Sequence, residues 1–122
     1  MKARFIDAGI VLQEICPNGD WNISNNDYDT LIWSENNPVS KPTKEDFDNK
    51  LTELQNAEPM RLLRKERNRR LQETDWWVLP DRTASQEQKD YRQALRDLPS
   101  TASPELDDNG QLSNVTWPTK PE

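Results

Sequence analysis

Apolar residues recur at helical spacing between residues 43 and 98, and this pattern constrains the fold more than any other feature of the sequence. Residues three or four apart lie on one face of a helix, and two such stripes are present, one on each side of Pro59. They comprise Phe47, Leu51, Leu54 and Ala57, then Met60, Leu63, Arg67 and Leu71. Because a proline inside a helix removes a hydrogen bond and crowds the preceding turn, we predict a kink or a break at Pro59.

The ends of these helices are also indicated. Thr43 is suited to cap the first helix, and Thr74-Asp75 ends the second stripe. Ser85 and Gln88 have the spacing of a capping box, which opens a further helix. That helix is expected to stop at Pro99, and its apolar face contains Tyr91, Ala94, Leu95 and Leu98. Residues 43–98 are therefore predicted to form a helical hairpin with a tryptophan-containing loop between its arms.

The region before this hairpin, residues 1–42, has a β-type pattern. Short apolar clusters precede Asn18-Gly19, and this dipeptide between apolar runs favours a β-hairpin turn. The clusters contain Phe5, Ile6, Ile10, Val11, Leu12 and Ile15. Tyr28–Trp33 alternates as a further strand, and Ser34–Pro42 is typical of a linker. We expect a small hairpin or three-stranded region here.

The last region, residues 99–122, holds four prolines and only scattered apolar residues. No periodicity is present, so an extended or disordered proline-rich tail is expected. The predicted fold class is therefore α+β, in three parts: a β region and linker (1–42), a helical hairpin (43–98) and an extended tail (99–122).

Composition limits what such a chain can do. Only 32% of its 122 residues are hydrophobic and 31% are charged, so the core must be small and we expect dependence on a partner. One cysteine, Cys16, and no histidine exclude internal disulfides, thiolate zinc sites and the commonest general base. We therefore expect no enzyme activity and no cofactor. No apolar run is long enough to cross a membrane, and no secretory signal opens the sequence.

The densest charge feature is the run Arg61–Arg70, with six bases and one acid. At helical spacing these bases spread around the axis, and nearby acids allow ion pairs four residues apart. Residues 43–98 contain twelve bases and twelve acids, and the whole chain has a net charge of −6. A solvated, salt-bridged helix is favoured over a nucleic-acid site, which remains as an alternative.

Tryptophans are the main candidates for partner contacts. Trp76 and Trp77 are adjacent in the expected loop, and we predict that one ring closes the helix pair while the other is exposed as an anchor. Trp117-Pro118 forms a second, extended candidate anchor. The predicted partner-binding residues are Trp76, Trp77, Leu79, Tyr91, Leu95, Trp117 and Pro118.

Several charged residues are expected to have structural roles. Arg67 lies within an apolar stripe, and we predict that it bridges to a carboxylate such as Asp75 or Asp97 across the helix pair. The residues predicted to form structural ion pairs are therefore Arg67, Asp75, Arg96 and Asp97. No nucleophile or base accompanies Arg67, so a catalytic role is not expected.

Three ordered sequence blocks resemble bacteriophage tail assembly chaperone and tail-fibre assembly proteins. The blocks are Arg64–Thr83 (RKERNRRLQETDWWVLPDRT), Asp90–Pro99 (DYRQALRDLP) and Val115–Pro121 (VTWPTKP). The resemblance carries over as motif positions Arg67, Asp75, Trp76, Tyr91, Arg92, Leu95, Arg96, Trp117 and Pro118. It implies a small non-enzymatic protein that helps tail or tail-fibre subunits to fold, trimerise or assemble.

The first functional hypothesis is therefore an assembly protein that masks an apolar patch on a tail or fibre subunit. A structural component of the virion tail, such as a baseplate or fibre adaptor, is the alternative, and a nucleic-acid-binding regulator is the third. We expect the protein in the host cytoplasm during virion assembly, with retention in the virion tail as an open possibility.

Overall fold

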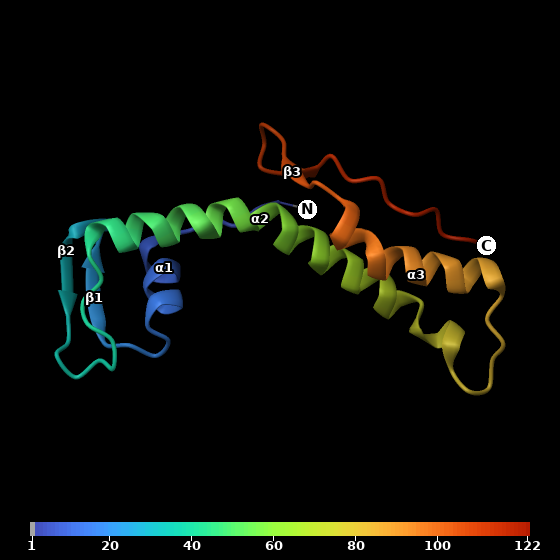
Figure 1. Cartoon of the computed structure of the whole chain (residues 1–122), viewed down its shortest axis with the longest axis horizontal. Coiled ribbons are helices and arrows are strands. Elements are labelled where there is room, and N and C mark those ends of the chain that lie inside the picture. Colours follow the sequence, from blue (N-terminus) through green and yellow to red (C-terminus); the bar gives the residue numbers. More distant parts are fainter. Residues whose placement is uncertain (1) are drawn as a thin grey trace. The chain divides into compact units, whose positions relative to one another are not determined.

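The computed structural model describes residues 2–122, and its element order is shown in Figure 1. The elements are α1 (Ala8–Ile15), β1 (Trp21–Ser24), β2 (Asp27–Trp33), α2 (Lys44–Glu73), a 3-10 helix η1 (Asp75–Val78), α3 (Gln86–Thr101), β3 (Glu105–Leu106) and β4 (Leu112–Ser113). β1 pairs with β2 and β3 with β4, both antiparallel. The α+β class is confirmed.

The chain divides into two compact units. The amino-terminal unit comprises residues 4–57, and the carboxy-terminal unit comprises residues 58–122 together with residues 2 and 3. The boundary falls inside α2, so the two halves of this helix belong to different units. This division differs from the three expected parts, because residues 99–122 belong with the second half of α2 and with α3.

The first apolar cluster is a helix, and the expectation of a strand there is wrong. Asp7 caps α1, because its Oδ1 accepts a hydrogen bond from the Ile10 amide at 2.8 Å. Ala8, Val11 and Leu12 follow at helical spacing and are all buried. A period of three to four residues buries one face of a helix, whereas a strand would place these residues on opposite faces.

The β-hairpin is present, but its turn lies seven residues later than expected. β1 and β2 are joined by Asn25 and Asn26, which have φ of 53° and 57°. Positive φ at both central residues gives the twist that two-residue hairpin turns require. Asn18-Gly19 instead links α1 to β1, where a Cβ on Gly19 would lie 2.9 Å from the Cys16 sulfur. The expected strand Tyr28–Trp33 is confirmed within β2.

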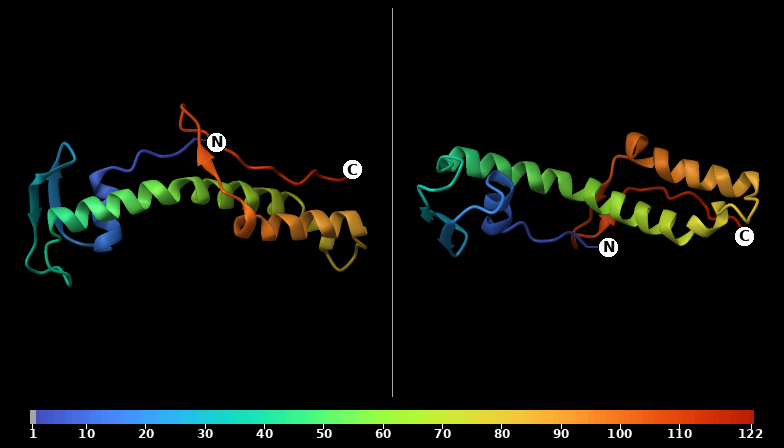
Figure 2. Two further views of the ribbon diagram at one scale, coloured as in Figure 1. Left: turned by 45° about the horizontal axis from the view of Figure 1, so that its top comes forward. Right: turned by 90° about the horizontal axis from the view of Figure 1, so that it is seen from below.

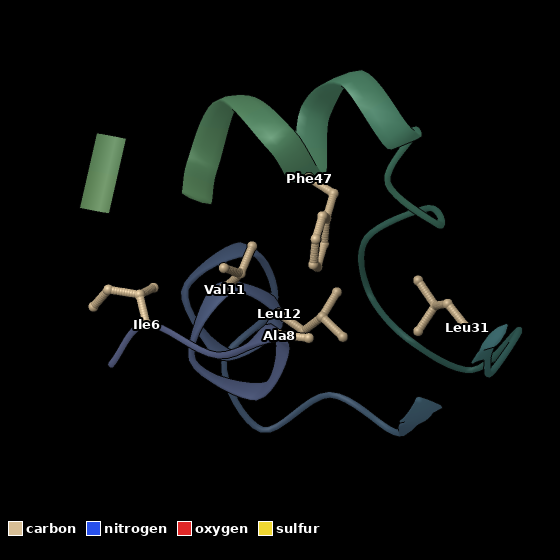
Figure 3. Close-up of a cluster of buried hydrophobic side chains, with 6 residues drawn as sticks. All are labelled: Ile6, Ala8, Val11, Leu12, Leu31 and Phe47. Carbon is tan, nitrogen blue, oxygen red and sulfur yellow. The ribbon is translucent and has the colours of Figure 1, made fainter. Parts of the chain in front are cut away.

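The core of the amino-terminal unit is apolar throughout. Figure 3 shows the cluster between α1, β2 and the first turns of α2, which comprises Ile6, Ala8, Val11, Leu12, Leu31 and Phe47. Tyr28 packs on Phe47 with ring centroids 5.7 Å apart, and its hydroxyl donates to the Pro42 carbonyl. The first stripe of α2 therefore covers α1 and the hairpin.

Helix α2 begins and ends as expected but is not broken at Pro59. Thr43 caps it by accepting a hydrogen bond from the Asp46 amide, and the helix continues through Pro59 to Glu73. A proline costs about 3 kcal/mol inside a helix. Burial of Leu62 and Leu63, each worth about 1.5–3 kcal/mol, offsets that cost. A break at Pro59 is therefore wrong, and a bend stays a prediction.

Helix α3 has the predicted start and a later end. Ser85 and Gln88 form the capping box, with reciprocal side-chain hydrogen bonds to backbone amides. The helix then runs through Pro99 to Thr101, so the expected stop at Pro99 is wrong.

The tail is not entirely extended. β3 and β4 form a hairpin whose turn is held by Asp107, because its Oδ1 accepts from the amides of Asn109 and Gln111, both at 2.9 Å. Gly110 supplies the positive φ of 76°. After β4 the chain is extended and runs alongside the helical hairpin of its own unit (Figure 2).

Candidate protein-binding site

The second half of α2, η1 and α3 enclose a small core in the carboxy-terminal unit. Its buried members are Trp77, Tyr91 and Leu95, and Leu71 and Trp117 pack at the rim. The rings of Trp77 and Tyr91 lie 6.0 Å apart at a tilt of 53°. We call these five residues the aromatic core. The structure therefore brings together four residues that were predicted as partner-binding, and it uses them mainly inside the unit.

Arg92 on α3 fixes the end of α2. It is buried, and its Nη1 donates to the Leu71 carbonyl at 2.8 Å and to Thr74 Oγ1 at 2.7 Å. Its Nη2 donates to Asp75 Oδ1 at 2.9 Å, which forms an ion pair. The last carbonyl groups of a helix lack the usual intrahelical donors, and the Leu71 carbonyl accepts from the Thr74 amide as well as from this guanidinium. Arg92 therefore holds η1 and its two tryptophans against α3.

The expected ion pairs are formed differently. Asp75 does pair with an arginine, but the partner is Arg92, whereas the Arg67 side chain donates to Asn68 Oδ1. A bridge from Arg67 to Asp75 or Asp97 is therefore wrong. On α3, the Arg96 and Asp97 side chains both bond to Gln93 rather than across the helix pair.

The tryptophan pair is divided in the predicted way. Trp77 is 4% exposed and lies in the aromatic core, whereas Trp76 is 48% exposed. Their rings are 6.3 Å apart at 72°, so the buried ring supports the exposed one from its edge. Val78 and Leu79 are also exposed. Trp76, Val78 and Leu79 lie within four consecutive residues, and we call them the exposed apolar patch.

A basic residue borders this patch. The Arg82 guanidinium stacks over the Trp76 ring at 4.2 Å from its centroid. Such a cation–π contact orients the ring without burying it. The patch is therefore an amphipathic surface on a short, fixed turn.

Trp117 and Pro118 pack back on their own unit. Trp117 contacts the aromatic core and lies under the Arg70 guanidinium, which is 4.3 Å from the ring centroid. Farther along the tail, Lys120 Nζ is 2.7 Å from Glu73 Oε1. Both Trp117 and Pro118 are half-buried. The tail anchor predicted from the sequence is thus occupied within the chain.

Three of the six basic residues in the run Arg61–Arg70 of α2 form ion pairs with acids. Arg61 pairs with Glu58, and the Glu66 carboxylate accepts from both Arg69 and Arg70. The Arg69 hydrogen bonds hold the pKa of Glu66 below its usual value. The predicted salt bridges are therefore present at these three arginines of the run.

The pKa of Glu73 is also lowered. Hydrogen bonding from Lys120 is the largest cause, and Arg69 adds to it. Because Lys120 belongs to the tail, the charge of Glu73 is linked to the position of that segment.

Sequence reasoning missed Arg92, Arg82, Val78 and Lys120 as members of the site. Arg92 was available as a motif position of the family resemblance, but its partners lie 17 or more residues away. The Lys120 contact spans 47 residues. Among these four residues, only Val78 could have been identified from its neighbours in the sequence, because it directly follows the tryptophan pair.

The structure gives no sign of a metal centre or a membrane span in the part of the chain that it describes. Within residues 2–122, no group of three or more histidine, cysteine, aspartate or glutamate side chains is placed to hold a metal ion. None of the helices in that range combines the length and apolar character that crossing a bilayer requires.

These features define a small α+β protein whose carboxy-terminal half is a helical hairpin with a tryptophan turn and a tail folded over it. Residues 60–122, slightly more than half of the chain, match the family model of the phage tail assembly chaperone protein. The chain belongs to this phage tail assembly chaperone family, which is an assembly family and not an enzyme family. No curated protein and no solved structure matched the chain. The matched range coincides closely with the carboxy-terminal unit.

Proposed function

We propose that this protein assists phage tail assembly by binding a tail or tail-fibre subunit through the exposed apolar patch. The family supports a role in tail assembly. Trp76 is the observation that carries the finer proposal, because a large ring left 48% exposed on a rigid turn is a typical binding anchor. The bound subunit is kept from premature association because its own apolar surface is covered until it oligomerises.

The turn that carries the patch is suited to this role. Trp77 fixes one side of η1 in the aromatic core, and Arg92 fixes the end of α2 just before it. Little side-chain and backbone freedom is therefore lost when a partner binds, and preorganisation of this kind favours affinity. Trp77, Tyr91 and Leu95 act as its support, while Trp76 and Leu79 make the contact.

A structural component of the virion tail is the second candidate. The division into two compact units favours it, because one unit could attach to one tail protein and the other unit to another. An assembly factor acts in the host cytoplasm and is absent or substoichiometric in purified virions. An adaptor is present there at a fixed copy number, so quantitative mass spectrometry of virions distinguishes the two.

The test of the proposed function is capture of co-expressed tail proteins. Trp76→Ala combined with Leu79→Ala should reduce capture at least about tenfold, since a lost hot spot costs 1.4 kcal/mol or more. Ile32→Ala is the matched control, because Ile32 is a 69% exposed apolar residue of the amino-terminal unit. Undiminished capture by the double variant, with helix content retained, would refute the assignment of the patch.

The nucleic-acid alternative has its own test. A gel shift at low and high salt should show no salt-sensitive DNA binding, because Arg61, Arg69 and Arg70 are already paired with acids. Strong binding that weakens with salt would restore that alternative.

A further inference from the structure

The extended segment after β4, residues 114–122, is attached to its unit by few contacts. Within the described chain, the only hydrogen bond of residues 115–122 is the one from Lys120 to Glu73. Asn114 makes one more, from its Nδ2 to the Ser103 carbonyl at 2.8 Å. Among residues 2–122, no backbone group of residues 115–122 forms a hydrogen bond with a strand or a helix. The segment is therefore held by side chains.

Trp117 makes the first side-chain attachment. Its ring packs against the buried members of the aromatic core, and the Arg70 guanidinium covers the ring at 4.3 Å from its centroid. The ring is only half-buried and lies at the rim, whereas Trp77 and Tyr91 are buried and pack on each other.

Lys120 makes the second attachment, three residues later. Its ammonium group lies 2.7 Å from Glu73 Oε1 and 5.8 Å from the centroid of the Trp77 ring. Lys120 and Glu73 are 49% and 40% exposed, and exposed ion pairs contribute little to stability. This attachment aligns the segment but does not secure it.

We propose that residues 114–122 form a displaceable strap, and that the surface beneath it binds an extended segment of a tail protein. The strap defines the chemistry that this surface accepts: a large aromatic ring that packs on the aromatic core under Arg70, and a cation three residues later that pairs with Glu73. This proposal deepens the proposed function, on which it rests, by adding a second, covered surface to the exposed apolar patch.

The tether explains how the strap regulates binding. A segment on a short linker acts at an effective concentration on the order of millimolar. A partner segment that is present at micromolar concentration competes poorly with it. A partner that first binds elsewhere, for example at the exposed apolar patch, is also local and can displace the strap.

The test uses the full-length protein and a fluorescent peptide of residues 113–122 as the probe. The variant with Trp117→Ala and Lys120→Ala should bind the peptide at least about tenfold more tightly than the wild type, because its own strap no longer competes. A peptide with Trp117→Ala should not bind. Fluorescence anisotropy measures both affinities, and circular dichroism checks that helix content is unchanged.

A second variant covers the case in which the double variant loses its fold. Lys120→Ala alone removes one exposed ion pair, so it should bind the peptide more tightly than the wild type by only about two- to fivefold, with the aromatic core intact. Equal affinity in the wild type and both folded variants, or equal binding of the peptide without Trp117, would overturn the proposal.

Exchange of straps between two copies of this chain is the competing explanation. It predicts a wild-type dimer in light scattering that Lys120→Ala dissociates, and that result would overturn the proposal in favour of self-association. The peptide assay does not depend on Trp76. A negative peptide result with intact, Trp76-dependent capture of a tail protein therefore rejects the strap alone and leaves the proposed function standing.

Discussion

The two units are stabilised in different ways. The amino-terminal unit has a continuous apolar cluster of six buried residues, to which eight further partly buried hydrophobic residues pack. The aromatic core of the carboxy-terminal unit has three buried residues and two at its rim. Arg92, Arg70 and Lys120 complete it with hydrogen bonds, a stacked cation and an ion pair.

This difference bears on function. Apolar packing is nondirectional and depends little on salt or pH. Ion pairs weaken with salt and are lost when their carboxylates are protonated, and both ion pairs and cation–π contacts can be exchanged for similar contacts with a partner. The unit that matches the assembly family is therefore the one whose surface contacts are easiest to replace, and the amino-terminal unit is the more self-sufficient of the two.

The largest effect is expected from a cavity in the amino-terminal cluster. Leu12→Ala removes a fully buried side chain and should lower the free energy of unfolding of this unit by about 2–5 kcal/mol. Hydrogen exchange measured by mass spectrometry reports on each unit separately. Faster exchange confined to residues 4–57 is expected, and Gln13→Ala, an exposed neighbour on α1, is the control. Equal acceleration in both units would show that they unfold together and would break the comparison.

The corresponding change in the carboxy-terminal unit is Arg92→Ala. It removes the guanidinium that donates to Thr74 Oγ1, to Asp75 Oδ1 and to the Leu71 carbonyl, and we expect a loss of about 2–3 kcal/mol because the Asp75 end of the pair is exposed. Arg96→Ala on the same helix should change stability by less than about 0.5 kcal/mol. Urea unfolding followed by tryptophan fluorescence measures both. A neutral Arg92→Ala would mean that α3 does not depend on this hydrogen-bond network.

A smaller effect is expected at acid pH. The pKa values of Glu66 and Glu73 are lowered, by Arg69 and by Lys120 respectively, from an ordinary value of 4.5. A carboxyl group with a lowered pKa in the folded state stabilises that state above the unfolded pKa. This contribution is lost as the pH falls from about 4.5 through the folded-state values. The thermal midpoint of the carboxy-terminal unit should therefore fall in this range.

The variants Glu66→Gln and Glu73→Gln provide the control for this pH dependence. Together they should flatten the decline below pH 4.5, because the groups that titrate are absent. If the wild type and the double variant decline in parallel, other carboxyl groups are responsible.

Local signals in the sequence were sufficient for much of the fold. Thr43, the Ser85 capping box and the two stripes of α2 act within one or two turns, so the starts of α2 and α3 were predicted correctly, whereas the effects of Pro59 and Pro99 were not. α1 was missed because its eight residues are dense in β-branched and apolar side chains, and the nearby Asn18-Gly19 favoured a hairpin. The cap at Asp7 and the spacing of the buried residues were the signal that identifies it.

The candidate site was less predictable, because its contacts join residues that are far apart in the chain. The division of Trp76 and Trp77 into an exposed and a buried ring follows from the small size of the core. The link from Arg92 to Asp75 and the return of Trp117 to the aromatic core depend on how α3 and the tail pack. Helical spacing alone does not determine that packing. The sequence therefore indicates Arg67 as the ion-pair partner of Asp75, whereas the partner in the structure is Arg92.

The smallest predicted effects compare two asparagines with positive φ, one in each unit. Asn25 has φ of 53° in the hairpin turn, and Asn114 has φ of 59° after β4. Among residues 2–122 the Asn25 side chain makes no hydrogen bond, whereas Asn114 Nδ2 donates to the Ser103 carbonyl at 2.8 Å. Glycine tolerates positive φ but provides no side-chain donor. Asn25→Gly should therefore be neutral, and Asn114→Gly should cost about 0.5–1 kcal/mol.

Alanine at the same two positions separates backbone strain from the lost hydrogen bond. Asn25→Ala should cost about 1 kcal/mol, because a Cβ disfavours the left-handed conformation, and Asn114→Ala should cost more because it adds that strain to the lost donor. Thermal unfolding of the two glycine and two alanine variants ranks their losses of stability. Equal effects of glycine at both positions would show that the Asn114 side chain does not hold the start of the strap. In that case Trp117 and Lys120 alone attach the tail to the carboxy-terminal unit, and the strap is looser than its first hydrogen bond suggests.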